Sequence, residues 1–296
     1  MGAAPTIMLR DDAALHVFDT HVFDTHVFDT QVLDTQVFDT GQGLPIVFQH
    51  GLGGDAAQVA LNFPDSPSRR RLTVECRAQG GSGAGGKRPF SIGMFANDVL
   101  AAADAAGIER FVAGGISMGA AIALHLAARH PARVTGLVLV RPAWTFDAAP
   151  QNMRPYVEVA ELIRDHPLEG ARDIFAASAT AARFRSEAPD NLASLLGFFA
   201  RDNASVFAEV MQAIANDGPG VTRAMATGLA IPTLVIGSGI DLVHPLATAR
   251  ELAETIPGAA FTEVTPKAAD KDRHFTGIRA AIGGFLDRNF NNQDHS

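Results

Sequence analysis

Short apolar runs alternate with amphipathic segments through most of the chain after residue 41. The runs have the length of strands, and the segments between them repeat apolar positions at helical spacing. The predicted strands are 45–49, 71–76, 111–114, 134–140, 232–237 and 261–264, and the predicted helices are 94–106, 118–128, 245–256 and 273–289. Strands that alternate with helices predict an α/β fold, with a doubly wound, mostly parallel β-sheet that carries helices on both faces.

The alternation stops between residues 146 and 227, where only helical patterns occur. These predicted helices are 156–164, 168–177, 191–201, 205–215 and 220–226. We interpret 146–227 as a helical cap inserted into an α/β core made of 41–145 and 228–296. In α/β enzymes such an insertion covers the carboxyl ends of the strands, where ligands bind.

Residues 16–40 form a tandem repeat with the sequence HVFDT HVFDT HVFDT QVLDT QVFDT. A strand alternates its faces every two residues, so a period of five moves the Val-Phe pair to the other face at each unit. We therefore predict an N-terminal segment, 1–40, in which only the last unit before Gly41 is the end of a strand. The other units are expected to form a protruding hairpin or a loose extension. A role as an oligomerisation element is the alternative, which leaves a homo-oligomer open.

Composition and charge exclude several classes of protein to which this chain could belong. One cysteine excludes an intrachain disulfide framework and a cysteine-based zinc site. The five aspartates of the repeat account for most of the net charge of −8, and there is no basic footprint of a nucleic-acid binder. No apolar run approaches the roughly 20 residues of a membrane helix, and no secretory signal is visible. We expect a cytoplasmic protein whose partner is a small-molecule substrate, not nucleic acid or a membrane.

The segment Gly115-Ile116-Ser117-Met118-Gly119 fits the pattern G-x-S-x-G. It follows a predicted strand and opens a predicted helix, which is the strand–turn–helix context that a serine nucleophile requires. At a helix N-terminus, unpaired N–H groups and the helix dipole favour developing negative charge. Ser117 is therefore the candidate nucleophile. The alternative is a glycine-rich turn in which Ser117 only caps the helix.

A second glycine-rich turn, His50-Gly51-Leu52-Gly53-Gly54, follows the first predicted strand of the core. Glycines directly after a strand let backbone N–H groups face a ligand. The N–H groups of Leu52 and Met118 are the candidate oxyanion hole. We expect His50 to be a structural, hydrogen-bonding residue of this loop.

Two other patterns do not predict a cofactor. Gly81 to Gly86 satisfies G-x-G-x-x-G, but no helix is expected to start there because Pro89 is close, so a dinucleotide site is not indicated. The sequence contains no H-E-x-x-H pattern. We expect no cofactor and no metal.

Five segments together resemble the α/β-hydrolase fold superfamily over roughly residues 41–290. They are HGLGG at 50–54, ECRAQGGS at 75–82, GGISMGAAIAL at 114–124, IGSGIDLVHP at 236–245 and the last predicted helix after His274. ECRAQGGS is similar to the family's D-x-R-G-H-G-x-S loop, with Glu75, Ala78 and Gln79 as replacements. The resemblance implies a serine hydrolase with a triad in the chain order Ser, acid, His, closest to the esterase and enol-lactonase type.

The resemblance implies that the acid follows a late strand, which makes Asp241 the acid candidate and Asp147 a distant second. His274 lies near the start of the last predicted helix. The apolar positions of that helix continue backwards to it at helical spacing, so it should face the sheet and reach both Ser117 and Asp241. His274 is the predicted base. His244 is its rival, with the alternative role of shaping the acid loop or the pocket.

These assignments predict a cofactor-independent serine hydrolase that cleaves a small carboxylic ester or lactone through an acyl-enzyme. Phe198, Phe199, Phe207 and Met211 of the insertion are candidates to line an apolar pocket, although core residues would show the same pattern. One alternative is a C–C bond hydrolase with the same triad. Another is a non-catalytic ligand-binding protein of the same fold.

Overall fold

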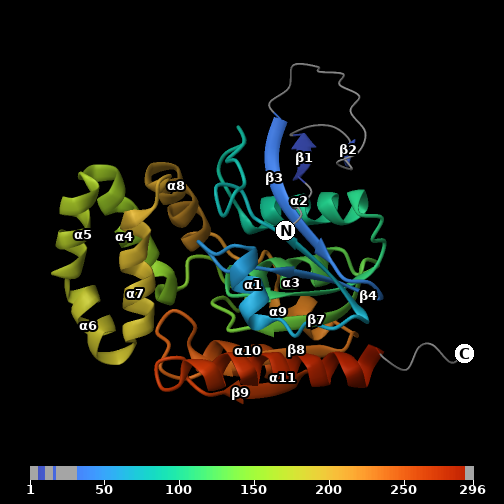
Figure 1. Cartoon of the computed structure of the whole chain (residues 1–296). Helices are drawn as coiled ribbons and strands as arrows, with labels where there is room; N and C mark the ends of the chain where they lie inside the picture. The colour runs from blue at the N-terminus through green and yellow to red at the C-terminus, as the bar shows by residue number, and fades with distance from the viewer. Residues whose placement is uncertain (1–5, 11–15, 18–31, 291–296) are drawn as a thin grey trace, which may run out of the picture.

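The computed structural model describes residues 6–10, 16–17 and 32–290, and in them nine strands form one sheet (Figure 1). The strand order is β2-β1-β3-β5-β4-β6-β7-β8-β9. The strands are β1 (Thr6–Arg10), β2 (His16–Val17), β3 (Val32–Thr40), β4 (Leu44–Gln49), β5 (Arg69–Val74), β6 (Phe111–Ile116), β7 (Val134–Val140), β8 (Thr233–Ser238) and β9 (Ala260–Val264). From β5 to β9 every neighbouring pair is parallel, while β3 joins β5 antiparallel.

Helices cover both faces of the parallel strands, as the doubly wound prediction requires. Successive residues of β7 show why: Leu137 and Val138 are both buried, and they belong to separate hydrophobic clusters on opposite faces. One cluster includes side chains of α2 (Ile92–Ala105), α3 (Met118–Arg129) and α10 (Leu246–Thr255), and the other includes side chains of α1 (Ala56–Asn62) and α11 (Lys271–Phe290). A strand buried on both faces must be apolar at every position, which explains the continuous apolar runs.

The predicted strands of the core are confirmed, with boundaries that differ by no more than two residues. The loop with the G-x-G-x-x-G pattern has no helix directly after it, and α2 begins only at Ile92, capped by the Ser91 hydroxyl on the N–H of Met94 at 3.0 Å. The short helix α1 was not predicted. It begins at a good N-cap, since the Asp55 carboxylate accepts from the N–H of Gln58 at 2.8 Å.

The end of the repeat is a longer strand than predicted. β3 covers the last two units and not only the last one, and it pairs antiparallel with β5, with Val37 opposite Val74. Val37 is fully buried, while Asp39 binds Arg70 through an ion pair at 2.6 Å. β1 and β2 were not predicted, and the predicted hairpin or extension falls mostly on residues 18–31, which lie outside the described residues.

The segment between β7 and β8 is helical, and in Figure 1 its helices α4 to α7 stand together beside the sheet. The helices are α4 (Arg154–Asp165), α5 (Leu168–Ala176), α6 (Ala179–Glu187), α7 (Pro189–Gly197), α8 (Ala204–Ala215) and α9 (Arg223–Thr227), with short 3-10 turns at Gln151–Met153 and Phe198–Ala200. α6 was missed because its sequence, ATAARFRSE, carries few apolar residues, and in the structure it buries only Ala181 and Phe184.

Candidate active site

Ser117 lies at a sharp turn between β6 and α3. Its backbone is strained, with φ of 56° and ψ of −110°, a conformation that costs a non-glycine residue about 1–3 kcal/mol. The flanking glycines make the turn possible. A Cβ on Gly115 would lie 2.4 Å from the carbonyl carbon of Gly119, and a Cβ on Gly119 would lie 2.3 Å from the carbonyl oxygen of Gln49. The turn therefore presents the serine hydroxyl at the carboxyl end of the sheet, where a ligand can reach it.

The imidazole that meets Ser117 belongs to His244. Its Nε2 lies 2.8 Å from the Ser117 hydroxyl oxygen, and its Nδ1 lies 3.0 Å from each carboxylate oxygen of Asp241. These contacts favour the tautomer in which Nδ1–H donates to Asp241 and Nε2 accepts the serine proton. The structure thus joins Ser117 and Asp241 through the histidine that the sequence analysis ranked second.

The expectation that His274 would make these contacts is wrong. His274 is fully buried and does face the sheet, as its helical spacing predicted. Its Nδ1 lies 2.7 Å from the carbonyl oxygen of Thr265, and its Nε2 has no hydrogen-bond partner among the described residues. The physical reason is that His274 Nδ1 binds the Thr265 carbonyl just after β9, while the His244 ring occupies the position between Ser117 and Asp241. Burial lowers the pKa of His274, partly offset by the Thr265 contact.

Asp241 is held by several donors in a buried position. Besides the His244 ring, its carboxylate accepts from the backbone N–H of His244 at 2.9 Å and from the Arg141 guanidinium. Burial alone would raise the pKa of Asp241, but the neighbouring His244 and Arg141 outweigh it and hold that pKa far below its ordinary value. Asp241 therefore stays ionised.

His244 sits between the opposing influences of its neighbours. Burial lowers the pKa of its imidazole, Asp241 raises it, and the Arg141 charge lowers it, with a net lowering. A neutral imidazole at neutral pH is the form that can accept a proton from Ser117.

In the turn at 50–54, three backbone N–H groups already donate to protein acceptors. Gly51 N–H donates to Gln58 Oε1 at 2.7 Å, Gly53 N–H donates to Gln79 Oε1 at 2.7 Å, and Gly54 N–H donates to the Gly51 carbonyl at 2.8 Å. In residues 32–290, Leu52 N–H donates no loop hydrogen bond, and Met118 N–H at the start of α3 donates none either.

His50 supports this turn, as the sequence analysis expected. Its Nδ1 lies 2.8 Å from the Gly51 carbonyl and its Nε2 lies 2.9 Å from the backbone N–H of Cys76. Nδ1 therefore carries the proton and Nε2 accepts. Burial lowers the pKa of His50, consistent with a neutral ring.

Sequence reasoning missed the role of Gln79. This side chain is fully buried, and its oxygen fixes Gly53, whose φ of +77° and close approach to Phe198 leave no room for a Cβ. The only signal was the departure from the family loop at this position. Glu75, another of the three departures, accepts from the N–H groups of Ala56 and Gly81 and so ties the two loops together.

Ser117 and His244 line a cavity of about 110 Å³. Its walls are more polar than predicted. Phe198 lines it as expected, but Phe199, Phe207 and Met211 belong to the hydrophobic core and do not line it. The other lining residues are Gly51, Leu52, Gln58, Ile116, Arg141, Tyr156, Asp190, Asn191, Ser194, Val243 and Lys267. The helical insertion therefore supplies much of the wall, and Asp147, the second acid candidate, is not part of it.

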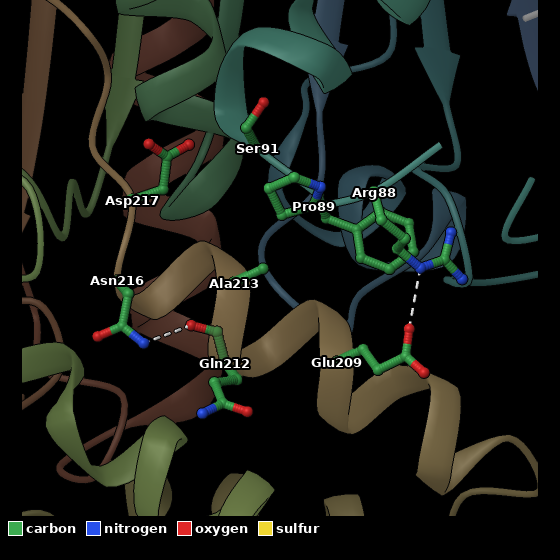
Figure 2. Close-up of a pocket in the computed structure, with 9 residues that line it drawn as sticks. Arg88, Pro89, Ser91, Glu209, Gln212, Ala213, Asn216 and Asp217 are labelled. Carbon is green, nitrogen blue, oxygen red and sulfur yellow. Dashed lines mark hydrogen bonds and ion pairs between the residues drawn. The ribbon is translucent and has the colours of Figure 1, made fainter. Parts of the chain in front are cut away.

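A larger hollow, of about 540 Å³, lies between α8 and the loop in front of α2, and Figure 2 shows residues that line it. Arg88 and Glu209 form an ion pair there at 2.9 Å, and Asp217 Oδ2 accepts from the N–H of Ile92 at 2.7 Å. These charged groups already bind protein partners and hold α8 against the core. The candidate active site is therefore the smaller cavity at Ser117.

The described residues show neither a metal-binding cluster nor a membrane-spanning helix. In residues 6–10, 16–17 and 32–290, no group of three His, Cys, Asp or Glu residues is arranged to hold a metal ion. None of the described helices combines the length and apolar character needed to cross a bilayer.

Comparisons with known proteins show which family this chain belongs to. A curated relative, "Putative carbamate hydrolase RutD" of Klebsiella pneumoniae (strain 342), is 31% identical over 186 residues, which are 59% of this chain and 65% of that protein. The match thus spans slightly less than two thirds of that relative. Among solved structures, the enol-lactonase from Burkholderia xenovorans LB400 is 28% identical with a TM-score of 0.62, covering 86% of this chain and 94% of that one.

A further solved structure, Est816, described as an N-acyl homoserine lactone degrading enzyme, is 25% identical with a TM-score of 0.59, covering 87% of this chain and 97% of that one. A family model described as alpha/beta hydrolase fold matches residues 45–275. That range runs from the first parallel strand of the core, through the Ser117 turn and the helical insertion, to the start of α11. The chain therefore belongs to the α/β-hydrolase fold family.

Proposed function

We propose that this protein is a cofactor-independent serine hydrolase that cleaves a small carboxylic ester or lactone with Ser117, His244 and Asp241 as its triad. One observation carries the proposal: the chain of contacts from the Ser117 hydroxyl through the His244 ring to the Asp241 carboxylate, at 2.8 and 3.0 Å. A nucleophile, a base within hydrogen-bond reach and a group that orients the base are the three parts that acyl transfer requires.

The reaction begins when the Ser117 oxygen attacks the substrate carbonyl carbon while its proton passes to His244 Nε2. Asp241 accepts the hydrogen bond from Nδ1–H and stabilises the imidazolium that forms. The tetrahedral intermediate collapses, the carbon–oxygen bond to the leaving group breaks, and the leaving oxygen takes the proton from His244. The acyl group then remains as an ester on Ser117.

Water completes the cycle. His244 takes a proton from a water molecule, the hydroxide oxygen attacks the acyl carbon, and Ser117 regains its proton as the ester bond breaks. An ester yields an acid and an alcohol, and a lactone yields one hydroxy acid.

The free N–H groups of Leu52 and Met118 are the donors that we assign to the oxyanion. Leu52, in the turn after β4, lines the same cavity as Ser117, and Met118 follows Ser117 at the N-terminus of α3. Such donors strengthen as negative charge develops on the carbonyl oxygen, and removing one typically costs about 10²–10³ in kcat.

The cavity supports a small substrate with polar groups. Its volume of about 110 Å³ lies below the roughly 300 Å³ at which pockets for drug-sized ligands begin. Tyr156 on α4 lines it, and burial raises the pKa of its phenol, so this hydroxyl remains a hydrogen-bond donor. Lys267, Asp190 and Ser194 add further polar groups. This revises the expected apolar pocket while keeping the small size.

The test is a panel of activated esters, lactones, carbamates and diketones, hydrolysed by the wild type and by Ser117→Ala. We expect ester or lactone turnover that falls by about 10⁴-fold or more in the variant, and labelling of Ser117 by a fluorophosphonate. Ser205→Ala, an exposed serine on α8, is the matched control.

The same experiment distinguishes the alternative functions. Faster turnover of diketones than of esters would favour a C–C hydrolase, and a carbamate preference would match the curated relative. Folded protein that no probe labels would favour a ligand-binding role and contradict the proposal.

A further inference from the structure

Arg141 makes contacts with the acid and the base that a three-residue triad does not need. It is the first residue after β7, and its side chain lies between that strand and the loop after β8. Its Nε and Nη2 atoms lie 2.9 and 2.5 Å from Asp241 Oδ2, and Nη2 lies 3.1 Å from His244 Nδ1. One guanidinium therefore touches both partners of the catalytic hydrogen bond.

The backbone at Arg141 directs the side chain to this position. Its φ is +46°, a conformation that a non-glycine residue adopts only when the surrounding structure imposes it. Its N–H donates to the carbonyl of Ile236 in β8 at 2.7 Å. The strand that carries Arg141 is thus bonded to the strand that leads into the acid loop, which fixes the distance between Arg141 and Asp241.

The two oxygens of the Asp241 carboxylate have different hydrogen-bond partners. Oδ2 takes both donors from Arg141, while Oδ1 accepts the backbone N–H of His244 at 2.9 Å, and the His244 ring N–H is 3.0 Å from either oxygen. Charge-assisted hydrogen bonds to a guanidinium are shorter and stronger than bonds between neutral groups. The two guanidinium donors and the His244 N–H together hold the Asp241 carboxylate beside the His244 ring.

The guanidinium also acts on the base through its charge. Arg141 Nη2 and His244 Nδ1 both carry protons, so the 3.1 Å approach is a repulsion once the imidazole is protonated. The other charged or titratable groups that line the cavity are Tyr156, Asp190 and Lys267, and Asp241 contacts the His244 ring from outside the lining. Of the two charged neighbours that touch the ring, Asp241 favours the imidazolium and Arg141 opposes it.

We propose that Arg141 is a positioning residue of the hydrolytic site, which clamps Asp241 against His244 and opposes protonation of the His244 ring through its positive charge. This inference rests on the proposed function. It adds a fourth residue to the machinery and assigns it a consequence for the pH range of the reaction.

The experiment compares Arg141→Met and Arg141→Lys with the wild type by pH profiles of kcat/KM on an activated ester. Arg141→Met removes both the clamp and the charge. We expect kcat to fall by about tenfold or more, and the acidic midpoint to move to higher pH by about one unit, because the imidazolium loses a repulsive neighbour. Arg141→Lys keeps the charge but not the two-atom grip, so its midpoint stays near the wild-type value while kcat recovers only in part.

The control is Arg250→Met, which removes an exposed arginine paired with Glu263 on the surface at 2.9 Å and should change neither quantity. Circular dichroism and fluorophosphonate labelling at high pH report whether each variant is folded. Arg141→Met with an unchanged rate and midpoint would overturn the inference, and so would a midpoint that moves to lower pH. If Arg141→Met does not fold, Arg141→Lys decides the question. An acidic midpoint that moves up by one pH unit in Arg141→Lys overturns the inference, and an unshifted midpoint with a reduced kcat supports it.

Failure of the proposed function gives a different pattern. In that case the wild type neither hydrolyses the ester nor is labelled at Ser117. If the activity is lost on substitution of Ser117 or His244 but is unchanged on substitution of Arg141, only the present inference is contradicted.

Discussion

The loops after β8 and after β9 lie at the same end of the sheet, yet only the first brings a histidine to Ser117. In the loop after β8, Asp241 and His244 are three residues apart, and the Asp241 side chain accepts the backbone N–H of His244. The proposed acid and base thus lie on one compact turn. In the loop after β9, the residue that reaches the cavity is Lys267.

Helices of the insertion hold the first loop in place. Asn191 Oδ1 accepts from Leu242 N–H at 2.8 Å, and Asn152 Nδ2 donates to the Val243 carbonyl at 2.7 Å. Both partners lie far from the loop in sequence, so the position of His244 depends on the packing of the insertion against the sheet.

The second loop is organised around the start of a helix. Asp270 N–H donates to the Pro266 carbonyl at 3.1 Å, and the Asp270 carboxylate accepts from Arg273 N–H at 3.0 Å, which caps α11. The charged run before His274 is therefore a helix-capping turn. The atoms that a histidine ring can contact therefore indicate a base better than the position of the histidine in the sequence does.

The largest expected effect is the difference between a substitution of His244 and a substitution of His274. His244→Ala should lower kcat by about 10⁴-fold or more, because Ser117 loses its proton acceptor. His274→Gln should retain kcat within about tenfold, because its ring contacts Thr265 and not Ser117. Steady-state kinetics on an activated ester measures both. The reverse order of effects would show that the second loop supplies the base.

A slightly smaller loss is expected for Asp241→Asn. The amide keeps the shape but removes the charge that fixes the His244 tautomer, and in a serine protease the same change costs about 10⁴ in kcat. The wild-type pH profile provides the reference. If the activity of the variant stays within tenfold of the wild type at every pH, the Asp241 carboxylate does not orient the His244 ring.

Lys267→Ala tests what the second loop contributes. Lys267 lines the cavity, so its removal should change KM by about threefold or more while kcat changes less. Measuring the two constants separately for esters with and without a carboxylate in the acyl group sharpens the comparison. A loss confined to kcat would instead place Lys267 in the chemical step.

The smallest effect concerns stability against pH. Burial lowers the pKa of His274 below that of the unfolded chain, so the unfolded state binds more protons as the pH falls through about 6.5. Stability contributed by the neutral ring is therefore present above that pH and is lost below it. Urea unfolding at pH 8 and pH 5.5 should show a shallower decline for His274→Gln than for the wild type. A steeper decline in the variant would contradict a buried neutral ring.

Much of the fold could be read in the sequence because it depends on local pattern, and so could Ser117 and Asp241, two of the three residues that the contacts join. Continuous apolar runs identified the buried parallel strands, and two glycines around Ser117 identified a turn that no other residues allow. The carboxylate after a late strand, Asp241, followed from the same local logic and from the family resemblance.

Only the tertiary structure decided which histidine meets Ser117. Both rings lie near the carboxyl end of the sheet and both are buried, so pattern and burial could not separate them. The choice depends on where α11 begins, on how the insertion holds the Leu242–Val243 backbone, and on the grip of Arg141 on Asp241. These are contacts between segments distant along the chain, and hydrogen-bond distances of a few ångströms between such segments are set by packing and are not visible in any local pattern.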